Sequence, residues 1–111
     1  MEKIDEYYVY ILRCKDNSLY TGIAKNVEKR YEEHLLGKGA KYTRARGVEK
    51  LEISFICNGR SQASKVEYYI KKHDKPWKEQ AIKEFSILES KIKKNLGIKI
   101  KKNIDKRINI V

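Results

Sequence analysis

Residues 7–14 read YYVYILRC and residues 19–24 read LYTGIA, and these two stretches decide the fold. Both are rich in aromatic and β-branched side chains, which is typical of β-strands. The residues between them, KDNS at 15–18, favour a tight turn because Asp and Asn tolerate left-handed backbone. We therefore predict an antiparallel hairpin. Gly22 in its second strand predicts a bulge or a close approach by another backbone segment.

Helical patterns follow the hairpin. Asn26 is a candidate N-cap for a helix over residues 27–36, with Val27, Tyr31 and Leu35 on its buried face and Gly37 after its end. Residues 37–50 have no apolar periodicity and predict a long exposed loop. LEISFIC at 51–57 predicts a third strand, and Ser61 is a candidate cap for a second helix.

The C-terminal third predicts one more helix and leaves the end of the chain open. Pro76 ends the second helix or starts the next one. A third helix carries apolar residues from Ala81 to Leu96 and stops at Gly97. Beyond Gly97 the isoleucines fit a strand pair or a frayed helix equally well. The order of elements predicts an α/β (α+β) fold, a small antiparallel sheet flanked by helices. We expect one domain over residues 1–90 and a basic helix end and tail over 91–111.

Composition limits the classes of function. The chain of 111 residues is the size of one domain, and no apolar run approaches the ~20 residues of a membrane span. Acidic residues within the first six positions argue against a signal peptide, so we expect a cytoplasmic protein without membrane attachment. Cys14 and Cys57 lack CxxC spacing, which argues against a zinc site or a disulfide framework.

The charge predicts a polyanionic partner. The net charge is +11, and residues 91–111 supply 8 − 1 = +7 of it, with the remaining +4 over residues 1–90. An excess of this size favours nucleic acid as the partner. A solvated, lysine-rich surface, or a basic domain that docks on an acidic protein through its tail, would also fit the charge.

Candidate site residues occur in three places outside the loop over residues 37–50. Tyr10 and Tyr20 lie on paired strands and share a face if the hairpin forms, although two core aromatics would give the same pattern. Arg30 and His34 are four residues apart and therefore share one helix face. Glu67 falls on the inward side of the second helix, where a carboxylate needs a metal ion or an ion pair, for which Lys71 is available.

The loop over residues 37–50 contains basic side chains around an aromatic one. Such a pattern suits a phosphate backbone with one stacked base, although a disordered basic loop is the simpler interpretation. Together with the tyrosines, Arg30 and Glu67, the loop describes phosphodiester chemistry: a proton acceptor, a cation for the phosphate, and a hard oxygen ligand. The loop residues expected to bind nucleic acid are Lys38, Lys41, Tyr42, Arg44 and Arg46.

The ordered set of these residues resembles the GIY-YIG nucleases, in the small stand-alone bacterial branch. The sequence YVY at 8–10 and YTG at 20–22 resemble the two motifs of the family, and Arg30 follows Gly22 by eight residues. GKGAKYTRAR at 37–46 resembles the loop of that branch. Where the first motif usually has glycine and isoleucine, this chain has Tyr8 and Val9.

The resemblance implies a three-stranded antiparallel sheet with flanking helices and hydrolytic cleavage of DNA. It implies one divalent ion, Mg²⁺ or Mn²⁺, at Glu67, and no small-molecule cofactor. Tyr10 would orient or deprotonate the attacking water with support from Tyr20, Arg30 would neutralise the phosphate, and His34 would position the first tyrosine or the phosphate. Lys25, Lys71 and Lys72 are further candidates for phosphate contacts. A catalytically silent nucleic-acid-binding module of the same fold is the alternative.

Overall fold

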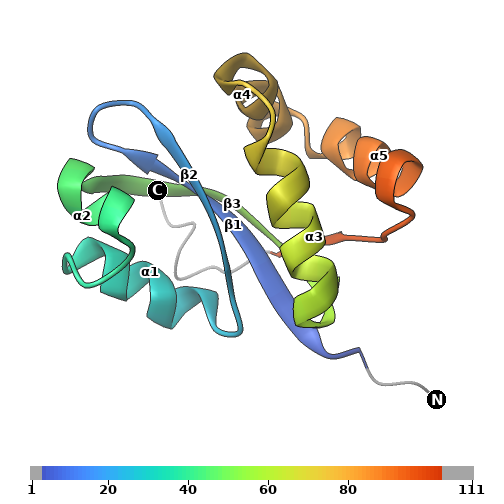
Figure 1. Ribbon diagram of the computed structural model, residues 1–111, viewed down its shortest axis with the longest axis horizontal. Helices are drawn as coiled ribbons and strands as arrows, with labels where there is room; N and C mark the ends of the chain where they lie inside the picture. Colours follow the sequence, from blue (N-terminus) through green and yellow to red (C-terminus); the bar gives the residue numbers. More distant parts are fainter. Residues whose placement is uncertain (1–3, 104–111) are drawn as a thin grey trace.

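The structure, a computed structural model, describes residues 4–103 and contains a four-stranded antiparallel sheet with helices on both faces (Figure 1). The strands run in the order β2-β1-β3-β4. The elements in chain order are β1 Glu6–Cys14, β2 Leu19–Ala24, α1 Val27–Leu35, α2 Lys41–Arg46, β3 Val48–Asn58, α3 Gly59–Lys71, α4 Lys75–Lys83, α5 Phe85–Leu96 and β4 Lys101–Lys102.

The predicted hairpin forms one side of the sheet, with β2 at the edge and β1 next to it in the interior. β1 pairs with β2 so that Tyr10 faces Gly22 and Leu12 faces Tyr20. The turn between them places Asn17 at φ 71°, a left-handed conformation that asparagine tolerates. On its other edge β1 pairs with β3 along its whole length, with Tyr10 opposite Ser54. β1 is therefore hydrogen-bonded on both sides, which gives its side chains fixed directions.

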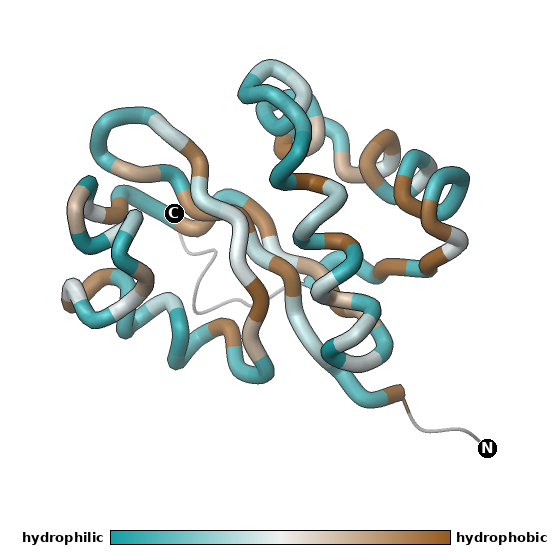
Figure 2. Tube along the Cα trace, viewed as in Figure 1, coloured by the Kyte–Doolittle hydropathy of each residue, from teal (hydrophilic) through white to brown (hydrophobic). Residues whose placement is uncertain are grey.

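Alternate residues of β1 serve two different cores, since successive side chains in a strand point to opposite faces. Val9 and Ile11 pack with α3, α4 and α5 on one face of the sheet. Tyr10 and Leu12 pack on the other face with Val27 of α1 and with Val48 at the start of β3. Figure 2 shows apolar stretches alternating with polar ones along α3 and α5, as expected of helices with one buried face.

A buried arginine joins α4 to the sheet. Arg13 of β1 is 9% exposed and donates two hydrogen bonds to Glu79 of α4, at 2.6 and 2.7 Å. It donates a third, at 2.8 Å, to Glu52 of β3. This guanidinium holds the pKa of Glu79 down at about 2. Removing one member of such a pair leaves a poorly hydrated charge, which is why these pairs are costly to break.

The structure differs from the predicted fold in the number of strands. β4 adds a fourth strand, because Lys101 and Lys102 pair with Ile56 and Phe55 of β3. Gly97 does end α5, in the left-handed conformation. Beyond it Ile98 and Ile100 are buried in the core but lie in neither a helix nor a strand, and only β4 follows within the described residues. The tail residues 104–111 lie outside the described residues.

Three helix boundaries also differ. The predicted loop over residues 37–50 contains α2 and the start of β3. α3 begins at Gly59 after Asn58, two residues before Ser61, the predicted cap. The predicted third helix is divided into α4 and α5 at Glu84, and Asp74 caps α4 with Pro76 in its first turn. No helix within residues 4–103 is long and apolar enough to cross a membrane.

The Arg13–Glu79 pair predicts a pH-dependent part of the stability. Because the pKa of Glu79 is lowered in the folded state, its contribution is complete above its ordinary value of about 4.5 and is lost as pH falls towards 2. We expect E79Q to have a lower Tm than the wild type at pH 7 and a smaller loss of Tm between pH 5 and pH 2.5. Thermal unfolding followed by circular dichroism measures both. E89Q, at an exposed position of α5, is the control, and equal pH profiles for E79Q and wild type would contradict the assignment.

Candidate active site

Tyr10 is the buried centre of the site and lies against Gly22. Its side chain is 2% exposed, although a phenol carries a hydroxyl group that needs a partner. A Cβ atom built on Gly22 would lie 2.6 Å from Cζ of Tyr10 and would collide with its hydroxyl. Glycine at this position therefore makes room for the ring. A close approach to Gly22 is present, but the Tyr10 side chain makes it and not the backbone segment that the sequence predicted.

Tyr20 shares the face of Tyr10, as the hairpin register predicts. Tyr20 stands opposite Leu12, diagonal to Tyr10, and the two ring centroids are 6.3 Å apart. Tyr20 is only partly buried and its ring lies 5.4 Å from that of His34. Of the two tyrosines, Tyr10 is the one whose hydroxyl is held by a hydrogen bond to His34.

His34 connects α1 to β1 and α2. The Tyr10 hydroxyl and His34 Nε2 are 2.9 Å apart, and His34 Nδ1 lies 2.7 Å from Oγ1 of Thr43 in α2. His34 is 2% exposed and Thr43 is 1% exposed. The sequence pattern placed Leu35 on the buried face of α1, but Leu35 is half exposed and His34 is buried in its place. Polar partners on both sides make this burial possible.

The segment after α1 closes over the imidazole. A Cβ atom built on Gly39 would lie 2.7 Å from Cε1 of His34 and would collide with Nδ1. Gly39 thus permits the backbone to pass against the ring. The prediction of an exposed loop was wrong here, because Gly39 and Thr43 both contact the site. Thr43 carries no apolar or charged pattern, and its only sequence signal is its place in GKGAKYTRAR.

Burial shifts the pKa values of Tyr10 and His34 in opposite directions. Desolvation, with the nearby Tyr20, raises the pKa of Tyr10 to about 12, while a hydrogen bond and the charge of Arg30 act against this rise. Desolvation and the charge of Arg30 lower the pKa of His34 to about 4. At pH 7 the phenol is therefore protonated and the imidazole is neutral.

Arg30 stands beside this pair with its charge partly accessible. Its side chain is one-third exposed and lies 3.1 Å from Glu33. Its positive charge acts on Tyr10 and lowers the pKa of the phenol, against the effect of burial. The structure thus brings Arg30 and His34, predicted to share one face of a helix, to Tyr10 of β1.

Glu67 reaches the site from α3, which passes along β2 at the edge of the sheet (Figure 1). Its side chain is 21% exposed and lies 3.2 Å from the ammonium group of Lys71 one turn later. That ammonium also lies 5.8 Å above the ring of Tyr20. The charge of Glu67 acts on Tyr10 and raises its pKa slightly further. The ion pair expected as the simpler role for Glu67 is present.

The donor set at Glu67 suits a weakly held hard cation. Within residues 4–103 there is no group of three or more His, Cys, Asp or Glu side chains that would enclose a metal ion. Mg²⁺ commonly takes one or two carboxylates and fills its remaining positions with water and substrate phosphate. A single, partly exposed carboxylate such as Glu67 fits that requirement.

The predicted nucleic-acid contacts fall into two groups. Lys38, Lys41 and Arg44 are exposed on and before α2. Arg46 and Tyr42 are already engaged: the Arg46 guanidinium lies 3.8 Å over the Tyr42 ring and 3.0 Å from Asp16, and Tyr42 stacks on Tyr20 at 5.9 Å. These two side chains support the site from the outside, which the sequence pattern did not indicate.

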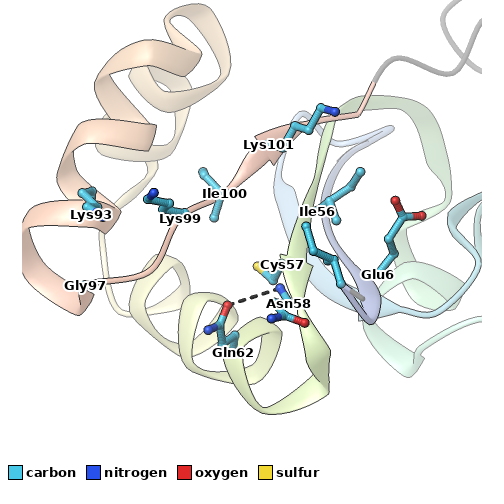
Figure 3. A pocket seen from close by; sticks show the side chains of 11 residues that line it. Glu6, Ile56, Cys57, Asn58, Gln62, Lys93, Gly97, Lys99, Ile100 and Lys101 are labelled. Carbon is cyan, nitrogen blue, oxygen red and sulfur yellow. Dashed lines mark hydrogen bonds between the residues drawn. The ribbon is translucent and has the colours of Figure 1, made fainter. Parts of the chain in front are cut away.

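The remaining lysines are placed less directly. Lys25 is exposed and pairs with Asp5 at 2.7 Å. The ammonium group of Lys72 lies 5.3 Å over the ring of Tyr69, another residue of α3. A cavity of about 590 Å³ lies elsewhere, between β3 and the end of α5, and none of the predicted site residues lines it. Figure 3 shows the side chains that line it. Among them, Oε1 of Gln62 accepts a hydrogen bond of 3.2 Å from the backbone N–H of Asn58.

Comparison with known proteins fits this arrangement. The family model described as the GIY-YIG catalytic domain matches residues 6–80, which include every member of the site. The chain belongs to the GIY-YIG nuclease family. A UPF0213 protein of Fusobacterium nucleatum is 50% identical over 96 residues, which cover 86% of this chain and 96% of that protein.

Other relatives carry the same designation, which states no activity. A UPF0213 protein of Clostridium perfringens is 47% identical over 91 residues, covering 82% of this chain and 98% of the relative. The solution structure of UPF0213 protein BH0048 from Bacillus halodurans is 42% identical, covers 70% of this chain and 83% of its own, and has a TM-score of 0.47. The GIY-YIG assignment therefore indicates a nuclease domain and leaves substrate and metal open.

The contact between Gly22 and Tyr10 predicts the effect of a single methyl group. Gly22 does not have positive φ, so G22A should cost stability through the collision alone, by roughly 1–3 kcal/mol. Urea unfolding of G22A and wild type measures this cost. In a Y10A background the added methyl group has room, and the cost should largely disappear. An equal cost in both backgrounds would show that the Tyr10 ring is not what Gly22 accommodates.

Proposed function

We propose that this GIY-YIG domain is a Mg²⁺- or Mn²⁺-dependent endonuclease that hydrolyses phosphodiester bonds in branched, damaged or single-stranded DNA. The observation that carries the proposal is the buried hydrogen bond between Tyr10 and His34, beside an accessible Arg30 and with Glu67 on the neighbouring helix. Burial alone would require some polar partner for the phenol, but a purely structural role would not need a cation and a carboxylate near the same ring. The grouping supplies a proton acceptor, a cation and an oxygen ligand at one place.

The protons of the reaction have a path through these side chains. Water attacks phosphorus and gives a proton to the Tyr10 hydroxyl oxygen, while Tyr10 passes its own proton to His34 Nε2 over 2.9 Å. Transfer in this coupled form suits the pKa values, because a standing phenolate is rare when the pKa of Tyr10 is about 12. His34, with a pKa near 4, is neutral and free to accept. The leaving oxygen takes its proton from solvent.

Arg30 and Glu67 meet the charge requirements of the transition state. The Arg30 guanidinium neutralises the phosphate, whose negative charge grows as the new bond forms. Glu67 would hold the divalent ion. When bound, such an ion supplies Lewis-acid stabilisation of the phosphoryl oxygens. Lys71, 3.2 Å from Glu67, would contribute a second positive charge to the substrate phosphate.

The exposed cations of α2 support DNA as the partner. Lys41 and Arg44 project from a short helix whose other side carries Thr43 into the site. Phosphate contacts of this kind are sequence-independent. A binding module without catalysis is the competing function, and the Glu67–Lys71 ion pair is the observation that favours it, since an ion pair alone would explain an inward carboxylate.

Glu67 decides between these two functions. We expect E67Q to abolish cleavage of labelled single-stranded, flapped, nicked and four-way DNAs in Mg²⁺ or Mn²⁺, because the amide is a much poorer ligand for a hard cation. DNA affinity, measured by fluorescence anisotropy in EDTA, should stay within about threefold, which is less than 1 kcal/mol. E89Q serves as the matched control on α5. Wild-type cleavage by E67Q, or no cleavage by the wild type on any DNA of the panel, would remove the nuclease proposal.

The α2 cations make a separate prediction about binding. Replacing both Lys41 and Arg44 with alanine should flatten the slope of log K against log salt concentration by roughly 0.7–0.9 for each lost phosphate contact. Titrations at several salt concentrations measure the slope. K83A, on α4, which packs on the other face of the sheet, should leave the slope unchanged. A slope unaltered in the double variant would place the DNA away from α2.

A further inference from the structure

The hydroxyl group of Thr43 determines the direction of the hydrogen bonds around His34. A threonine hydroxyl has one proton, and this proton is used: the group donates to the carbonyl oxygen of Ala40 at 2.9 Å. A carbonyl oxygen can only accept, so the direction of this bond is fixed. At its other contact, 2.7 Å from His34 Nδ1, the Thr43 oxygen must therefore accept. Nδ1 carries the proton.

This assignment leaves His34 Nε2 unprotonated. A neutral imidazole carries only one N–H proton, and in His34 this proton is on Nδ1. The 2.9 Å contact between Nε2 and Tyr10 is then a hydrogen bond donated by the phenol. The bonds run in one direction, from Tyr10 through His34 and Thr43 to the carbonyl oxygen of Ala40.

We propose that Thr43 is a positioning residue that holds His34 in the Nδ1-protonated tautomer, so that Nε2 is free to take the proton of Tyr10. The catalytic consequence rests on the nuclease function proposed above, whereas the tautomer itself does not. In the opposite tautomer Nε2–H would point at Tyr10, and the phenol would have no acceptor for its proton. All three side chains are at most 2% exposed, so water is not available to replace Thr43.

Two variants of Thr43 separate the hydroxyl from the packing. T43V keeps the branched shape and removes the acceptor of the Nδ1–H bond. T43S keeps the hydroxyl and loses one methyl group. If the hydroxyl is what matters, T43S should behave as the wild type and T43V should not, whereas a role in packing alone would make T43V the milder change.

The tautomer is read directly by long-range ¹H–¹⁵N NMR of the histidine side chains at pH 7, without DNA or metal. We expect Nδ1–H for His34 in the wild type and T43S, and partial or complete conversion to Nε2–H in T43V. His73 is an internal control, because its Nδ1 donates to the carbonyl of Tyr69 at 2.7 Å and should not change. Backbone ¹H–¹⁵N spectra confirm that each variant is folded.

Kinetics give the second readout. Loss of a proton acceptor of this kind predicts a fall in kcat of at least about tenfold in T43V, restored in T43S, with DNA affinity unchanged. Nε2–H on His34 in the wild type would overturn the proposal, and so would T43V with wild-type kcat or T43S as impaired as T43V. Because the NMR arm needs no activity, failure of the nuclease function in the Glu67 experiment and failure of this proposal are distinguishable.

Discussion

The hydrogen bond from Tyr10 to His34 is the contact on which the arrangement of the first half of the chain depends. A phenol buried to 2% exposure requires a polar partner, and His34 of α1 supplies it, which brings α1 against the face of β1. The imidazole in turn needs a partner for its second nitrogen, which brings α2 back over α1 through Thr43. Gly22 and Gly39 provide the space for both rings. The hydrogen bonds that link Tyr10, His34 and Thr43 thus position α1, α2 and the segment between them.

The position of the site at the β2 edge follows from how the two faces of the sheet are covered. The tyrosines belong to the face packed with α1, while Glu67 belongs to a helix of the opposite layer. These groups can approach one another only where the sheet ends, at β2. Lys71 above the Tyr20 ring marks this junction. An accessible phosphate can therefore contact side chains from both layers without entering a deep cavity.

Much of this arrangement could be predicted from the sequence, for identifiable reasons. The hairpin pattern puts Tyr10 and Tyr20 on one face, and helical spacing joins Arg30 to His34, so these positions follow from periodicity. Thr43 could not be found in that way, because its role depends on a single hydroxyl bond in a six-residue helix without an apolar pattern. The engagement of Arg46 by Asp16 and Tyr42 depends on a turn far away in sequence. β4 has two residues and no strand pattern of its own.

The alternation along β1 has a consequence for how this protein can change over evolution. Positions such as Val9 and Ile11 face only the helical layer, so they can exchange among apolar residues, with compensation from α3 or α5, while the reactive side stays untouched. Substitution of Tyr10 is constrained differently, because its hydroxyl group makes a buried hydrogen bond that an apolar side chain cannot replace. The two faces of β1 are therefore under separate constraints. Lineages can diverge widely in their helical layer and still conserve the same chemistry.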